Sequence, residues 1–162
     1  MKFAHYVMLE VFLRDEKPTC LDTLAPLTME EVLAGEAKQQ ENKLVYSPPK
    51  TGINVELSDV EGDAGRIIIV RYFFRRASHT NAFFKLLKQE LSQAELARLR
   101  AECERRLDEH GDFFFRLDKN ALKQGRLVLV DRGDCVQVKV SPAAYPKNRR
   151  TARDVLLRIL DD

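Results

Sequence analysis

The sequence predicts an α+β fold, namely a single domain whose helices pack on one face of a mixed, mostly antiparallel sheet in two layers. Two apolar patterns predict it. One is alternation with polar residues, which is typical of strands, and the other is recurrence every three or four positions, which is typical of amphipathic helices. Because 162 residues suffice for one domain with a substantial core, we expect residues 1–162 to form a single domain.

The first half of the chain is expected to hold a strand, a helix and a hairpin, separated by breaks at Pro and Gly. The strand, the helix, two less regular segments and the two arms of the hairpin are expected over residues 3–13, 21–33, 36–43, 47–50, 53–57 and 66–74. The second arm of the hairpin contains the uninterrupted apolar run Ile67 to Val70, which predicts a central strand covered on both faces.

The second half is expected to hold two helices, three strands and a closing helix. Ser92 and Glu95 have the spacing of a capping box, so one helix ends near Leu91 and a second follows, ending at Gly111. A short helical turn is expected between Asp118 and Gly125. The three strands and the closing helix are expected over residues 113–117, 126–130, 135–140 and from about 147 onward, with 126–140 forming a hairpin.

The predicted core consists of residues on the apolar faces of five of these elements. Burying one such side chain contributes about 1.5–3 kcal/mol, so the elements should pack together. The positions expected to be buried are Ile67, Ile69, Phe83, Leu87, Leu99, Val138, Val155 and Ile159.

Charge is distributed unevenly along the chain, although the net charge is only +2. Residues 1–65 carry 6 Lys or Arg and 12 Asp or Glu, whereas residues 66–88 carry 6 Lys or Arg and no acid. Residues 112–162 carry 11 basic and 7 acidic residues. An acidic first third followed by basic segments favours a localised surface for a polyanion.

Basic residues accompany the start of two expected helices. Arg75 and Arg76 come directly before a helix that we expect Ser78 to cap, and a second basic run opens the last helix. Cations at a helix N-terminus are unfavourable by about 0.3–1 kcal/mol each, but together with free N–H groups they suit an anion. We therefore expect both clusters to lie on one face and hold a phosphate backbone, the alternative being solvated surface charges. The candidate binding residues are Arg75, Arg76, Lys85, Lys88, Arg116, Lys119, Lys147, Arg149, Arg150 and Arg153.

The sequence contains little that indicates an enzyme. Cys20, Cys103 and Cys135 are far apart and form no CxxC pair, which indicates neither a disulfide framework nor a zinc site and favours the cytoplasm. No phosphate-binding loop, dinucleotide fingerprint or nucleophile–base spacing is present. We expect no enzyme, no catalytic residues, no metal and no cofactor, and no apolar run is long enough to span a membrane.

The last third of the chain contains the runs Phe114-Phe115-Arg116-Leu117-Asp118-Lys119, Gly133-Asp134-Cys135 and Ala143-Ala144-Tyr145-Pro146-Lys147. Together with His5-Tyr6 and Arg76-x-x-His79 near the other end, they resemble a small archaeal family of predicted exosome-associated RNA-binding proteins. The resemblance implies a fold similar to a ribosomal protein that binds 5S RNA, of a double-stranded-RNA-binding type. It also implies RNA and exosome subunits as partners, and no catalytic activity.

Two functions are consistent with these observations. The first is an RNA-binding accessory protein of archaeal RNA processing or exosome-mediated decay, which grips the phosphate backbone with basic helix N-termini. The alternative is a protein–protein adaptor of a cytoplasmic complex, whose acidic first third docks a basic partner without direct RNA contact. Salt dependence separates them, because phosphate contacts give an affinity that falls steeply with salt concentration.

Overall fold

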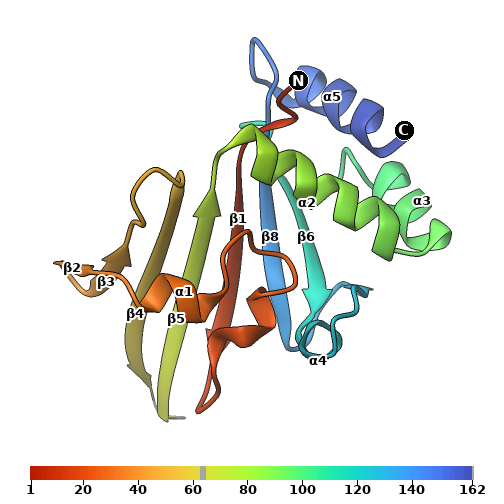
Figure 1. Ribbon diagram of the computed structural model, residues 1–162. Helices are drawn as coiled ribbons and strands as arrows, with labels where there is room; N and C mark the ends of the chain where they lie inside the picture. Colours follow the sequence, from red (N-terminus) through yellow and green to blue (C-terminus); the bar gives the residue numbers. More distant parts are fainter. Residues whose placement is uncertain (63–64, 162) are drawn as a thin grey trace.

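The helices lie on one face of a single antiparallel sheet in the computed structural model, which describes residues 1–62 and 65–161 (Figure 1). The described residues form eight strands in the order β2-β3-β4-β5-β1-β8-β6-β7. This arrangement confirms the α+β fold. The strands are β1 Ala4–Leu13, β2 Ala37–Gln40, β3 Lys43–Tyr46, β4 Ile53–Gly62, β5 Gly65–Phe74, β6 Phe113–Asp118, β7 Leu129–Val130 and β8 Cys135–Pro142.

Five α-helices and a 3-10 turn cover the inner face of the sheet, within the described part of the chain. Their bounds are η1 Pro18–Leu21, α1 Met29–Leu33, α2 Ala77–Glu90, α3 Gln93–Ala101, α4 Lys119–Lys123 and α5 Arg149–Asp161. None of the helices described combines the length and the apolarity that a membrane span requires.

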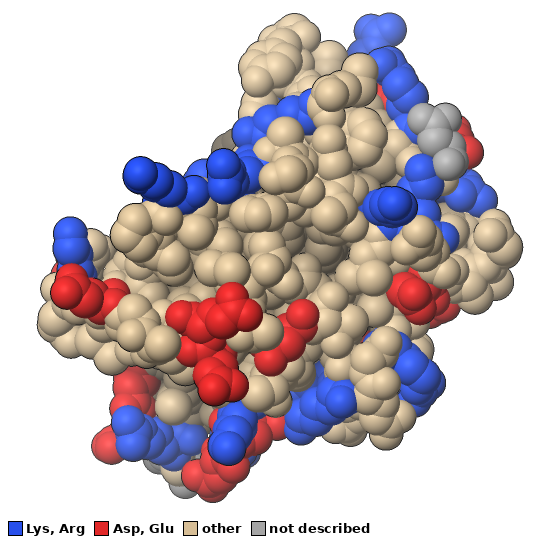
Figure 2. All heavy atoms as spheres, in the orientation of Figure 1, with Lys and Arg blue, Asp and Glu red and all other residues tan. Residues whose placement is uncertain are grey.

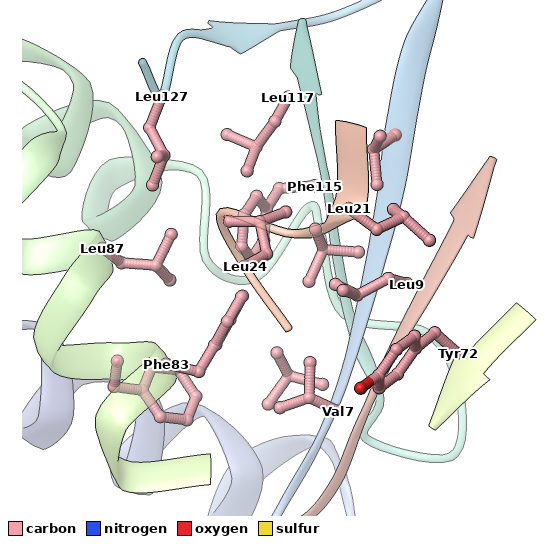
Figure 3. Packing of buried hydrophobic residues seen from close by; sticks show 14 of the residues in the cluster. Val7, Leu9, Leu21, Leu24, Tyr72, Phe83, Leu87, Phe115, Leu117 and Leu127 are labelled. Atoms are coloured by element: carbon pink, nitrogen blue, oxygen red, sulfur yellow. The ribbon is translucent and has the colours of Figure 1, made fainter. Parts of the chain in front are cut away.

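The core lies between the sheet and the helices. Strand β1 is central and contributes Val7 and Leu9, which pack with Tyr72 of β5 and with Phe83 and Leu87 of α2 (Figure 3). All five are fully or almost fully buried. Of the eight residues predicted to be buried, Phe83, Leu87, Leu99, Val138 and Ile159 are buried and Val155 is half-buried.

Ile67 and Ile69 are only half-buried, so the prediction that β5 is covered on both faces was wrong. In β5 it is Val70, Tyr72 and Phe74 that face the helices. Because side chains alternate along a strand, Ile67 and Ile69 face outward. An uninterrupted apolar run therefore does not establish burial on both sides here, and the outer face of the sheet carries apolar side chains.

Local capping fixes where several helices begin. The predicted capping box is present, because the Glu95 N–H donates to Ser92 Oγ at 3.1 Å and the Ser92 N–H to Glu95 Oε1 at 2.9 Å. At α5 the Thr151 N–H donates to Asn148 Oδ1 at 3.0 Å. The predicted Ser78 cap was wrong, since the N-cap of α2 is Arg76 and Ser78 lies in the first turn.

Other boundaries differ from the prediction for identifiable reasons. The helix expected over 21–33 is divided into η1 and α1, because Pro26 lacks an N–H and the Tyr72 hydroxyl bonds both backbone groups of Leu27, at 2.8 and 3.1 Å. The polar segment after Gly35 forms the β2–β3 hairpin. The helix that begins after Ser92 ends at Ala101 rather than near Gly111.

The hairpin predicted over 126–140 is not formed, because β6 lies between β7 and β8 and pairs with both. The connecting turn is anchored instead to the start of α4, where the Lys119 N–H donates to the Asp134 carbonyl at 3.1 Å. One side of β6 is completely buried, since its alternating residues are Phe113, Phe115 and Leu117. This burial favours a position of β6 inside the sheet.

Lys119 links β1 to the turn before β8 at the end of the sheet where α4 lies, the lower end in Figure 1. Its side chain is 1% exposed, and its ammonium lies 2.7 Å from Asp134 and 2.9 Å from Glu16 and donates to the Phe12 carbonyl at 2.7 Å. Although burial raises the pKa of Glu16, hydrogen bonds from Lys119 and Lys123 outweigh it and lower that pKa to about 2. Glu16 therefore stabilises the fold above its ordinary pKa of 4.5, and this contribution is lost as the pH falls towards 2.

We expect Lys119→Met to destabilise the protein by about 3 kcal/mol, the lower end for breaking a buried ion pair, since Glu16 and Asp134 keep some access to water. Urea unfolding of both proteins measures this difference. It should be largest near neutral pH and shrink as the pH falls below about 4.5, where Glu16 becomes protonated in the unfolded chain. A pH-independent difference would contradict the ion-pair account.

Candidate nucleic-acid interface

The two basic clusters lie at the same end of the sheet, where α2 and α5 begin on either side of the N-terminal segment (Figure 1). The Phe3 N–H donates to Asn81 of α2 at 3.1 Å, and the Phe3 carbonyl accepts from Ala143, which precedes α5, at 2.9 Å. Figure 2 shows that Lys and Arg predominate towards this end of the helix-covered face, whereas Asp and Glu lie mainly lower, where further Lys and Arg accompany them. Chain segments far apart in sequence thus form one basic end.

Arg75 and Arg76 follow β5 and lie in different surroundings. The Arg75 guanidinium lies over the Phe73 ring, 5.5 Å from its centre, on the outer face of the sheet. Arg76 caps α2 and donates from Nη1 to the Lys50 carbonyl at 3.2 Å. Both side chains are exposed, and within residues 1–62 and 65–161 neither forms an ion pair. Their charges therefore stay available to a ligand.

Lys147 is held by a buried carboxylate. Its ammonium pairs with Asp112, which is 6% exposed, and donates to Ser141 Oγ at 2.8 Å. Lys139 lies 3.7 Å from the other oxygen of Asp112. One carboxylate therefore positions two lysines at the rim where β6 and β8 reach the basic end.

The three arginines in the first half of α5 differ in how many contacts they make within the protein. Arg149 donates to the Glu104 carbonyl at 2.6 Å, and Arg153 forms an ion pair with the Glu104 side chain. Arg150 is exposed and forms no ion pair with the rest of the described chain. Arg149 and Arg153 therefore tie α5 to the segment after α3, whereas Arg150 is the freest cation of this cluster.

The remaining predicted residues are dispersed. Lys85 is exposed and Lys88 half-buried on α2, in the helical layer, whereas Arg116 is exposed on β6 and donates to the Asp131 carbonyl at 2.7 Å. Lys119 is buried, and its ammonium is fully used by three acceptors at the opposite end of the sheet. It is a structural residue, and its burial excludes it from a surface that binds phosphate.

The outer face of the sheet carries a row of aromatic and basic side chains, of which only Arg75 was predicted from the sequence. The row crosses the four adjacent strands β5, β1, β8 and β6. The Tyr6 and Phe73 ring centres are 6.1 Å apart, and the Lys139 ammonium lies 5.6 Å from the Tyr6 ring and 5.9 Å from the Phe114 ring. We call Arg75, Phe73, Tyr6, Lys139 and Phe114 the open-face row.

The open-face row differs in charge from the row of residues next to it. There, Arg71 pairs with Glu10 at 2.6 Å, and Lys43 pairs with Glu56 at 3.1 Å. In the open-face row, burial lowers the pKa of Lys139, but the Tyr6 hydroxyl and Asp112 raise it above its ordinary value. Lys139 therefore stays charged at neutral pH, and the row presents positive charge beside half-buried rings.

The strand pattern contains a signal for this row. In the run Phe113-Phe114-Phe115 the outer two residues are buried and the middle one is half-exposed, as alternation requires. Phe73 lies in the same way between two buried aromatic residues of β5. Consecutive aromatic residues in a one-sided sheet must place some rings outside, which identifies Phe73 and Phe114.

Comparison with known proteins identifies a family and a shared fold. A family model described as RNA binding matches residues 35–141. Among solved structures, a DUF54 protein from Methanothermobacter thermautotrophicus is 20% identical, with 98% of each chain covered and a TM-score of 0.67. A DUF54 protein from Archaeglobus fulgidus is 18% identical over 96% of this chain and 99% of its own, with a TM-score of 0.69. None of the curated proteins matches this chain.

A protein of the group named UPF0201, from Methanococcus jannaschii, is 15% identical over 94% of this chain and 93% of its own, with a TM-score of 0.51. At these identities the likeness to solved structures shows the fold alone. The fold is therefore shared with archaeal proteins along nearly the whole chain.

Replacing Asp112 with Asn should destabilise the protein by about 2 kcal/mol, because it weakens a hydrogen bond to a charged group and leaves two lysines without their shared carboxylate. Denaturant unfolding provides the measurement. Glu109→Gln is the matched control, since this exposed neighbour should change stability by less than about 0.5 kcal/mol. Equal stabilities of the two variants would contradict the role assigned to Asp112.

Proposed function

This chain belongs to the family described as RNA binding, and we propose that it binds RNA through the basic end of the molecule, with exposed cations on the phosphate backbone. The observation that carries the proposal is the convergence of two clusters, more than 70 residues apart in sequence, at the end where α2 and α5 begin (Figure 1). Positive charge concentrated on one surface is the electrostatic footprint of a nucleic-acid-binding protein.

The proposed contacts divide according to how each cation is held. Arg75, Arg76 and Arg150 are exposed and free of ion pairs within the described chain, so they can neutralise phosphates without breaking an ion pair. Lys147 and Arg153 already pair with Asp112 and Glu104, which reduces their net positive charge. We therefore assign the larger electrostatic contribution to the three free arginines.

The first turn of α2 adds hydrogen-bond donors at the same place. Its N-cap residue, Arg76, provides no side-chain cap among the described residues, so N–H groups of this turn remain open to an anion. At α5 the Asn148 side chain already accepts from Thr151. We therefore propose that free N–H groups at the helix N-terminus bind phosphate at α2. Helix α5 contributes the positive charge of its side chains.

The wider role is proposed from the resemblance described above. We propose a non-catalytic accessory protein of cytoplasmic RNA processing or exosome-mediated decay, since the family description names binding and no reaction. Affinity purification of the natively expressed protein tests this. Exosome subunits should co-purify, and nuclease treatment should remove those held only through RNA. Salt-insensitive capture of one protein partner in the absence of RNA would favour the adaptor function instead.

The double variant Arg76→Gln/Arg150→Gln should bind RNA more weakly by a similar factor for unrelated sequences, because phosphate contacts carry no sequence information. Each lost contact should lower the slope of log affinity against log salt by about 0.7–0.9. Fluorescence anisotropy over a salt series measures both quantities.

Arg14→Gln is the control for that experiment. Arg14 is an exposed arginine just beyond β1, at the opposite end of the sheet, so its replacement should leave affinity and slope unchanged. Stability of all variants should change by less than about 0.5 kcal/mol. An unchanged salt slope in the double variant would refute the proposed phosphate contacts.

A further inference from the structure

We propose that the open-face row (Arg75, Phe73, Tyr6, Lys139 and Phe114) binds unpaired bases of single-stranded RNA by stacking; this inference rests on the RNA-binding function proposed above and names its substrate class. The row lies on the face of the sheet that the described helices leave uncovered. Phe73, Tyr6, Lys139 and Phe114 come from four strands that are hydrogen-bonded neighbours, so the sheet fixes their relative positions, and Arg75 directly follows β5.

The register places the rings side by side across the sheet. Met8 of β1 pairs with Phe73 on one side and Lys139 on the other, and Lys139 pairs in turn with Phe114. Tyr6 lies two residues before Met8 in β1 and therefore on the same face, and its ring centre is 6.1 Å from that of Phe73. At roughly 4.8 Å between strands, the row extends about 14 Å. RNA-binding sheets of comparable width stack two or three bases on their aromatic residues.

The chemistry of the row fits a nucleotide better than a purely apolar partner. Each cation of the row is within 6 Å of a ring centre, so one site offers a π-face for a base and a positive charge for its phosphate. Arg75 is exposed and can leave the ring face for a phosphate, whereas Lys139 is held beside the rings by Asp112. Cross-strand aromatic packing alone would account for paired rings but not for a cation beside each one.

The same geometry disfavours two other occupants. An isologous dimer through this face would enclose Arg75 and Lys139 of both copies in one interface, where these four like charges would lose water. In double-stranded RNA the base faces are stacked within the helix and cannot reach the rings. The basic end lies directly beside the row, because Arg75 belongs to both and Lys147 shares Asp112 with Lys139. A strand held there by its phosphates could place its bases on the sheet.

The test is fluorescence anisotropy with a labelled single-stranded oligoribonucleotide and with the same strand annealed to its complement. Phe73→Leu and Phe114→Leu should each weaken single-strand binding about tenfold and leave duplex binding unchanged. Phe73→Tyr and Phe114→Tyr are the matched controls and should bind as the wild type does, because they keep the ring.

Tyrosine fluorescence gives a second readout that does not depend on how well the leucine variants fold. The chain has no Trp and four Tyr, so stacking of a base on Tyr6 should quench a measurable part of the emission. Tyr6→Phe should keep the affinity and lose this part of the quenching. Unaltered quenching in Tyr6→Phe would overturn the proposal.

The outcomes separate this inference from the function on which it rests. If the leucine variants bind the single strand like the wild type while Arg76→Gln/Arg150→Gln does not, the stacking site is refuted and the proposed function stands. If the wild type binds neither RNA, the proposed function fails and the inference with it. A dimer in sedimentation that Phe114→Leu dissociates would identify the row as a contact between copies and also overturn the proposal.

Discussion

The two hydrogen-bond ladders of β1 are the interaction on which the rest of the structure depends. This central strand pairs with β5 on one side and with β8 on the other. Because side chains alternate, the register that buries Val7 and Leu9 under the helices also places Tyr6 beside Phe73 and Lys139 on the outer face. A slip by one residue would exchange the two faces, so burial of the core fixes the arrangement of the row.

Charge is used in two separate ways at the two ends of the sheet. At the lower end Lys119 binds Phe12 and Glu16, which are more than 100 residues away in sequence, and also Asp134. Its ammonium is therefore fully occupied by contacts within the fold. At the upper end Arg75, Arg76 and Arg150 remain exposed. Between these ends, Asp112 pairs with both Lys147 and Lys139 and positions them, which links the basic end to the outer face.

Local patterns in the sequence were sufficient for the fold class and for much of the core, because periodicity reports which side of an element is buried. The capping box at Ser92 and Glu95 was predicted for the same reason, since both partners lie within one turn. Nonlocal pairing was not predictable. Nothing near β7 indicates that β6 separates it from β8, and nothing near Lys119 indicates that Glu16 lies against it.

The candidate site was predicted in part, for a related reason. Basic residues near helix starts are visible in one sequence, and two clusters of them do lie at one end of the molecule. Apart from Arg75, the open-face row was not predicted, because its other residues come from four strands and converge only through the register of the sheet. Alternation alone marks Phe114 as outward, but its proximity to Lys139 depends on the β6–β8 pairing.

The most direct test of the account is ultraviolet cross-linking of single-stranded RNA to the intact protein, followed by mass spectrometric identification of the attached residues. The account predicts cross-links to Tyr6, Phe73 or Phe114 on the outer face of the sheet. Cross-links confined to the helical layer, for example around Lys85 and Lys88 of α2, would contradict it.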